Sequence, residues 1–250
     1  KTSQYSLSSY SIPTQILWSI LAVGCVGALG YAVYESFEFS WLQFLILGVA
    51  VAFAAIANQY HPNFKSTKYQ ISATELTVIW GVVWLGLPGG TFLSVVAGVA
   101  SYNIFPKDKK RWLASVFVGG ISAAAAALAF YLYLKNFVNF DGTVLAASEI
   151  SPLWLLSGIG LLATVRFVVY NILFTAFSKL ETGISFGRTI QGVLNANLLS
   201  YAFGVPAAII FHYSFVQFGY VVGIIALPLV VAAHLFYRMH FQSIELKTKE

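Results

Sequence analysis

Arg166 lies near the middle of a long apolar segment over residues 152–177. A charged side chain at that depth in a membrane costs about 2.5–3.5 kcal/mol on insertion scales, so it usually faces the interior of a helix bundle and has a partner. The best candidate partner is the carboxylate of Glu75. Three interpretations remain open: a structural Arg166–Glu75 ion pair, a polar cavity that holds an anionic or hydrogen-bonding ligand, and an arginine that lines a subunit interface.

Further polar residues accompany Arg166 in the expected helices. Tyr170 follows it by one helical turn on the same face, and Asn171 is the next residue. Asn195 and Asn197 open a later apolar segment, where they either cap the helix or face the same cavity. The residues that we expect to bind a ligand or to be buried polar groups are Arg166, Glu75, Tyr170, Asn171 and Asn195.

The sequence lacks the motifs of common enzyme classes. It contains no HExxH, Walker loop, GxSxG or dinucleotide fingerprint. The histidines do not cluster in the sequence, and Cys25 is the single cysteine. His212 is expected at an outer helix end and His234 lies within an apolar run, so each is either a satisfied histidine or a ligand of a haem or chlorophyll. We therefore predict no catalytic residues, no metal site and no cofactor for this chain.

The composition indicates that lipid is the solvent for most side chains. Of the 250 residues, 58% are hydrophobic and only 9% are charged, whereas a soluble domain has about 45–50% apolar and about 25% charged residues. The mean hydropathy is +0.78. A soluble enzyme, a disordered regulator and a nucleic-acid-binding module are excluded, and the net charge of +5 is better explained by orientation in a bilayer.

The apolar segments predict an all-α membrane helix bundle, because about 20 apolar residues cross a bilayer as a helix. We expect about eight spans, six of them ordinary and two joined in a hairpin over residues 71–105. The hairpin is predicted because its two short segments meet at Leu87–Gly90, where Pro and Gly favour a tight turn. It forms either two thin spans or a re-entrant element. The segments are residues 13–34, 41–57, 71–87, 90–105, 112–134, 152–177, 193–212 and 215–237.

Basic residues define the expected orientation. If both termini are cytoplasmic, Lys135 is the only basic residue in the outer loops, and Arg166 is the only one inside a span. The outer loops then carry acidic residues, which agrees with the positive-inside rule. We expect residues 1–238 to form the membrane bundle and residues 239–250 to begin a cytosolic helix or linker. The chain reads as the ordered part of a longer polypeptide.

Small residues and prolines suggest further features. Gly219 and Gly223 form a GxxxG motif, which lets helices pack closely within the monomer or across a homodimer. The proline-containing segments 85–90 and 203–208 are weakly similar to each other. Paired broken helices of this kind surround the binding sites of transporters.

The order of these elements resembles the N-terminal membrane domain found ahead of HD-GYP or GGDEF modules in bacterial signalling proteins. The likeness extends over nearly the whole chain, and the Gly-Pro break at 86–88 also looks like one in vitamin-uptake S-components. No HD dyad or GYP motif occurs here. The resemblance is carried by a strand-like run at 69–72, the break at 86–88, a basic loop at 107–111 and short motifs at 169–171, 183–185, 204–206, 218–220, 227–229 and 237–241.

This resemblance implies a sensory input domain of the bacterial inner membrane that regulates a cytosolic cyclic di-GMP output module. Its partners would be the lipid bilayer, a small ligand, and the output domain or a partner protein. Two alternatives remain: a small-molecule transporter or substrate-binding membrane subunit, and an accessory subunit of a larger membrane complex with a pigment or haem.

Overall fold

The structure is a computed structural model that describes residues 10–59, 74–101, 109–139 and 150–219. These residues are almost entirely helical, and no strand occurs among them. The chain divides into two compact units, Lys1–Ile209 and Ile210–Glu250. The strand-like run at 69–72 and the domain boundary expected at residue 239 both lie outside the described residues.

Six α-helices make up the described part of the chain. Proline stands in the first turn of the first and fifth helices, where its missing N–H costs no hydrogen bond. Gly183, at a φ of 70°, ends the fifth helix in the left-handed conformation that favours glycine. The helices are α1 (Ile12–Ser36), α2 (Trp41–Gln59), α3 (Thr74–Ala100), α4 (Lys109–Tyr133), which continues into the short π-helix η3 (Leu134–Val138), α5 (Pro152–Thr182) and α6 (Phe186–Phe218).

By total length and composition, all six helices qualify as membrane spans, as in a multi-pass membrane protein, with α3 counted at its full 27 residues. Eight separate spans are not found among the described residues. The two segments expected at 71–87 and 90–105 both belong to α3, and most of the segment 215–237 lies outside the described residues. The boundary expected at residue 212 is wrong, because α6 continues to Phe218.

The helix α3 folds back on itself at Gly86, whose φ of 66° and ψ of −152° are not helical. A Cβ atom added to Gly89 would lie 2.5 Å from the carbonyl oxygen of Gly81, so the two arms lie side by side. Each arm is about 18–21 Å long at 1.5 Å per residue, which is less than the roughly 30 Å core of a bilayer. The expected hairpin is present, and its short arms favour the re-entrant form.

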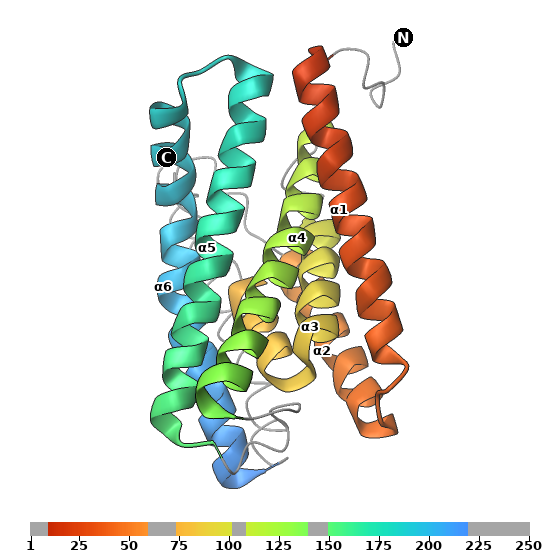
Figure 1. Ribbon diagram of the computed structural model, residues 1–250, viewed down its shortest axis with the longest axis vertical. Helices are drawn as coiled ribbons and strands as arrows, with labels where there is room; N and C mark the ends of the chain where they lie inside the picture. Colours follow the sequence, from red (N-terminus) through yellow and green to blue (C-terminus); the bar gives the residue numbers. More distant parts are fainter. Residues whose placement is uncertain (1–9, 60–73, 102–108, 140–149, 220–250) are drawn as a thin grey trace, which may run out of the picture. The chain divides into compact units, whose positions relative to one another are not determined.

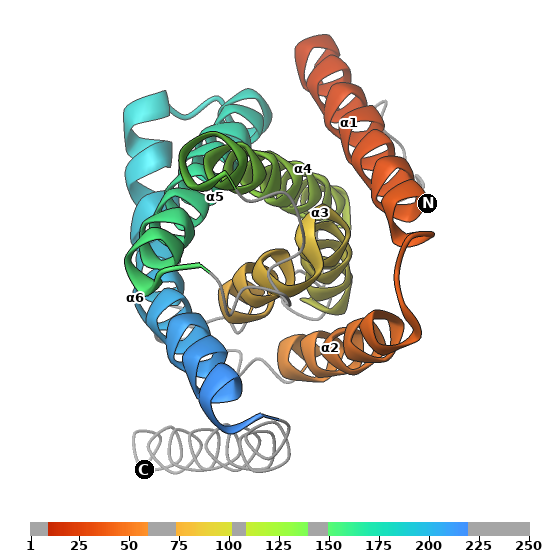
Figure 2. The same cartoon turned by 60° about the horizontal axis from the view of Figure 1, so that its bottom comes forward.

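Within Lys1–Ile209, α3 and α4 are the two central helices. Helix α4 packs against α1, α3 and α5, while α2 packs against α3. Figure 1 shows α4 between α1 and α5, and Figure 2 shows it beside α3 and α5. One apolar core joins α1, α4 and α5 through Leu21, Val118 and Phe177. The folded-back helix α3 and α4 are therefore held in the interior, where their polar residues meet α5.

The predicted GxxxG packing motif is not helical at its first glycine. Helix α6 ends at Phe218, and Gly219 follows with a φ of 64° and an amide that donates to the Phe215 carbonyl. This geometry is that of a glycine that terminates a helix. Gly223 lies outside the described residues.

Candidate functional site

The guanidinium of Arg166 forms a two-pronged ion pair with the carboxylate of Glu75. Nε donates to Oε2 at 2.7 Å, and Nη2 donates to Oε1 at 3.1 Å. The Arg166 side chain is 1% exposed and that of Glu75 is 10% exposed. Parallel hydrogen bonds of this kind are stronger and more directional than a single contact. An Arg166–Glu75 ion pair, one of the three interpretations that the sequence left open, is therefore present.

The remaining edge of the Arg166 guanidinium faces oxygen atoms of α3 and α4. Nη1 lies 3.3 Å from each of three acceptors: the hydroxyls of Ser94 and Ser122 and the carbonyl of Gly119. A buried ion pair offsets its desolvation only when further hydrogen bonds satisfy the two groups. These oxygens supply such bonds. Because Glu75 and Ser94 belong to different arms of α3, the pair connects the hairpin to α4 and α5.

Gly204 of α6 packs directly against the start of α3. A Cβ atom at this position would lie 2.8 Å from the Cβ of Glu75 and 3.1 Å from the amide nitrogen of Leu76. The absence of a side chain thus lets the α6 backbone approach the ion pair. Tyr201, one turn earlier, packs edge-on against Phe167 of α5 at 4.8 Å between ring centroids.

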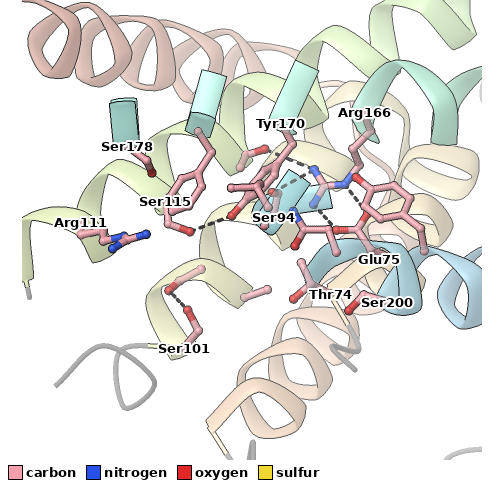
Figure 3. A pocket seen from close by; sticks show the side chains of 18 of the residues that line it. Thr74, Glu75, Ser94, Ser101, Arg111, Ser115, Arg166, Tyr170, Ser178 and Ser200 are labelled. Carbon is pink, nitrogen blue, oxygen red and sulfur yellow. Dashed lines mark hydrogen bonds and ion pairs between the residues drawn. The ribbon is translucent and has the colours of Figure 1, made fainter. Parts of the chain in front are cut away.

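A cavity of about 770 Å³ extends from the ion pair and is lined by residues of five helices, α2 to α6. On α5 its lining residues recur every four positions from Arg166 to Thr182, which corresponds to about 24 Å of helix. On α4 the same spacing places Arg111, Ser115 and Gly119 on one face. Figure 3 shows the polar side chains of these helices around a common space. The α5 residues that line the cavity are Arg166, Tyr170, Phe174, Ser178 and Thr182.

Aromatic rings form part of the cavity wall. The rings of Tyr170 and Phe174 stack with 5.8 Å between centroids, and the guanidinium carbon of Arg111 lies 5.7 Å from the centroid of Phe174. The hydroxyls of Tyr170 and Ser115 share a hydrogen bond of 3.0 Å. The wall thus combines flat apolar surface with hydroxyl groups and positive charge.

The structure brings most of the predicted site residues together. Arg166, Glu75 and Tyr170 line the cavity. Asn171 is buried behind it, donates to the Phe167 carbonyl at 2.6 Å, and accepts a 2.9 Å hydrogen bond from the side chain of Asn197.

Asn195 does not belong to this group, because it is exposed and does not line the cavity. Of the two asparagines that were expected to cap the helix or face the cavity, Asn197 lines the cavity. Sequence reasoning also missed several polar lining residues. The four-residue spacing of polar side chains after Arg166 was the signal that could have revealed those on α5. The missed residues include Arg111, Ser115, Ser178, Thr182, Arg188 and Ser200.

In the described ranges, no group of three or more His, Cys, Asp or Glu side chains is placed to hold a metal ion. His212 is buried in the part of α6 that belongs to the unit Ile210–Glu250, and His234 lies outside the described residues. Cys25 is buried in α1. The site is therefore best described as a polar cavity with an ion pair, aromatic rings and two further arginines.

Comparison with protein-family models, curated proteins and solved structures finds no match for this chain. Its function is therefore inferred from the geometry of the cavity and the arrangement of its charges.

Proposed function

We propose that this chain is a membrane input domain that binds a small ligand in its interior and passes the binding event to a cytosolic module. The observation that carries the proposal is the cavity of about 770 Å³ that five otherwise apolar helices line with polar side chains. Ligand pockets typically have volumes of about 300–1,000 Å³ and combine apolar walls with a few placed polar groups.

The arrangement of polar residues supports a ligand site over a purely structural network. A structural network in lipid needs only to satisfy its own polar groups, because unpaired groups are costly there. The Arg166–Glu75 pair achieves this with short contacts at one end of the cavity. Polar residues nevertheless continue along α5 to Thr182, far beyond the pair. A bound molecule explains why they face a shared space.

The signalling part of the proposal rests on the resemblance to membrane domains that precede HD-GYP or GGDEF modules. On this proposal the protein resides in the bacterial inner membrane with both termini in the cytoplasm. Ligand binding would change the relative positions of α5, α6 and the re-entrant helix α3, which meet at Glu75. The output would be a change in cyclic di-GMP turnover by a cytosolic module.

Filling the cavity with a side chain should abolish ligand binding. Gly192 lines the cavity, and a Cβ atom there meets nothing within 4 Å, so the backbone accepts a side chain and Gly192→Trp adds bulk to the space. The matched control is Gly160→Trp, because Gly160 is equally open but does not line the cavity. The measurement is the melting temperature of each purified protein in the presence of fractions of a small-molecule extract from the host cells.

We expect at least one fraction to raise the melting temperature of the wild type and of Gly160→Trp, because a ligand that binds only the folded state stabilises it. The same fraction should leave Gly192→Trp unchanged. An equal response of both variants, or a wild type that responds to no fraction, would contradict the proposal.

A transporter or substrate-binding membrane subunit is the second candidate. The re-entrant helix α3 favours it, because broken helices that line a cavity are typical of transporter binding sites. The two functions differ in what happens to the ligand. In proteoliposomes a transporter accumulates the stabilising compound inside the vesicle, whereas an input domain binds it with a fixed stoichiometry and no accumulation.

A further inference from the structure

We infer that the ligand of this cavity is a small organic anion whose negative group binds between Arg111 and Arg188. This inference rests on the proposed function, since it names the chemical class that the cavity selects. Among the described residues, the charged side chains that line the cavity are three arginines and one glutamate. The Arg166–Glu75 pair is internally neutral. Among these described lining residues, the positive charges outside that pair are those of Arg111 on α4 and Arg188 on α6.

The backbone adds to this positive potential. Arg111 is the third residue of α4, and Arg188 is the third residue of α6. The N-terminus of a helix carries about half a positive charge, so acidic residues are favoured in the first turn and basic ones are not. Neither helix has an acidic residue in its first turn. Two helix N-termini and two arginines thus contribute the same sign of charge to one cavity, which is the arrangement that binds anions.

The rest of the wall is suited to the body of such a ligand. The stacked rings of Tyr170 and Phe174 provide a flat apolar surface. The Ser178 hydroxyl is buried, lines the cavity and has no hydrogen-bond partner in the described part of the chain. Figure 3 shows Arg111, Ser115 and Ser178 around the same space. A carboxylate or phosphate at the arginines, with an apolar or aromatic body against the rings, satisfies both parts of the wall.

The charge preference of the cavity can be measured with thiol reagents of different charge. Ser115→Cys, in a Cys25→Ser background, places one thiol in the cavity one turn from Arg111. The protein is reconstituted in phosphatidylcholine nanodiscs. Its rates of reaction with sulfonatoethyl, trimethylammonium-ethyl and neutral methyl methanethiosulfonate are each divided by the rate for free 2-mercaptoethanol.

We expect the anionic reagent to be favoured over the cationic reagent by at least about tenfold, because the positive charges of Arg111 and Arg188 attract the anionic reagent and repel the cationic one. Arg111→Gln and Arg188→Gln should each reduce this ratio. Lys135→Gln is the matched control and should leave it unchanged, since Lys135 does not line the cavity.

An anionic-to-cationic rate ratio at or below one would overturn the inference, and so would a ratio that neither arginine variant changes. Either result would leave the cavity itself intact. Failure of the neutral reagent to react would instead contradict the proposed function, because the cavity would be closed. A second set of nanodiscs that contain phosphatidylglycerol identifies the source of the anion. Slower labelling there assigns the site to a lipid headgroup, and unchanged labelling assigns it to a soluble anion. Both results agree with an anion site.

Discussion

Arg166→Leu should lower the free energy of unfolding by about 3–5 kcal/mol, because it leaves the carboxylate of Glu75 buried without its counter-charge. The Arg166 side chain provides both prongs of the ion pair and also binds oxygens of α3 and α4. Its removal therefore exposes several polar groups to an apolar environment at once. The measurement is denaturant or thermal unfolding of the purified protein in detergent.

Two further variants distinguish the loss of the Arg166–Glu75 ion pair from a general effect of removing a positive charge. Lys135→Leu removes an exposed lysine whose contact is with the Tyr131 hydroxyl at 3.4 Å, and it should change stability little. The double variant Arg166→Leu with Glu75→Leu should be more stable than Arg166→Leu alone, because replacing both partners of a buried pair leaves no unpaired charge. Wild-type stability in Arg166→Leu would contradict the buried pair.

Gly89→Ala should destabilise the protein by about 2–3 kcal/mol, because the added methyl group has no room between the arms of α3. A Cβ atom at this position would lie 2.5 Å from the backbone oxygen of Gly81 and 2.5 Å from the Cβ of Leu85. Neither neighbour is the flexible end of a side chain, so the two arms must separate. Because Glu75 and Ser94 belong to these arms, their hydrogen bonds to Arg166 should weaken as well.

The matched control for Gly89→Ala is Gly48→Ala in α2, where an added Cβ atom meets nothing within 4 Å. In a helix interior this change should stabilise by about 0.5–1 kcal/mol, since alanine loses less backbone entropy than glycine. The two glycine variants therefore have effects of opposite sign in the same unfolding assay. A Gly89→Ala protein as stable as Gly48→Ala would show that α3 is not folded back at Gly86.

The ion pair could be predicted from the sequence because an unpaired charge inside the membrane is energetically costly. A charge in the middle of an apolar segment requires a partner, and Glu75, at the start of the Pro-Gly-Gly hairpin, was the best candidate. The hairpin was predictable for a similar reason, since Pro88 and the glycines around it favour a turn. Whether its arms form two thin spans or one re-entrant element was open, because the sequence does not show how closely Gly81 and Gly89 approach.

The cavity was only partly predictable. Asn195 and Asn197 are two positions apart, so they point about 200° apart around a helix and only one of them can face a given neighbour. The rotation of α6 about its axis decides which, and that rotation depends on contacts such as Gly204 against Glu75. Arg111 and Arg188 were read as orientation signals in loops. Their place in the first turn of α4 and α6 emerges only from the packed helices.

A cysteine scan along α5 tests most directly the claim that its polar face lines an open cavity. Single cysteines in a Cys25→Ser background replace Tyr170 and Phe174, which line the cavity, and Val168 and Ile172, which are exposed on the outer face of the helix. Each protein is treated in nanodiscs with a water-soluble thiol reagent. We predict reaction at positions 170 and 174 and none at 168 and 172, where lipid covers the thiol. Equal reaction at all four positions, or reaction at 168 and 172 alone, would contradict an aqueous cavity on this face.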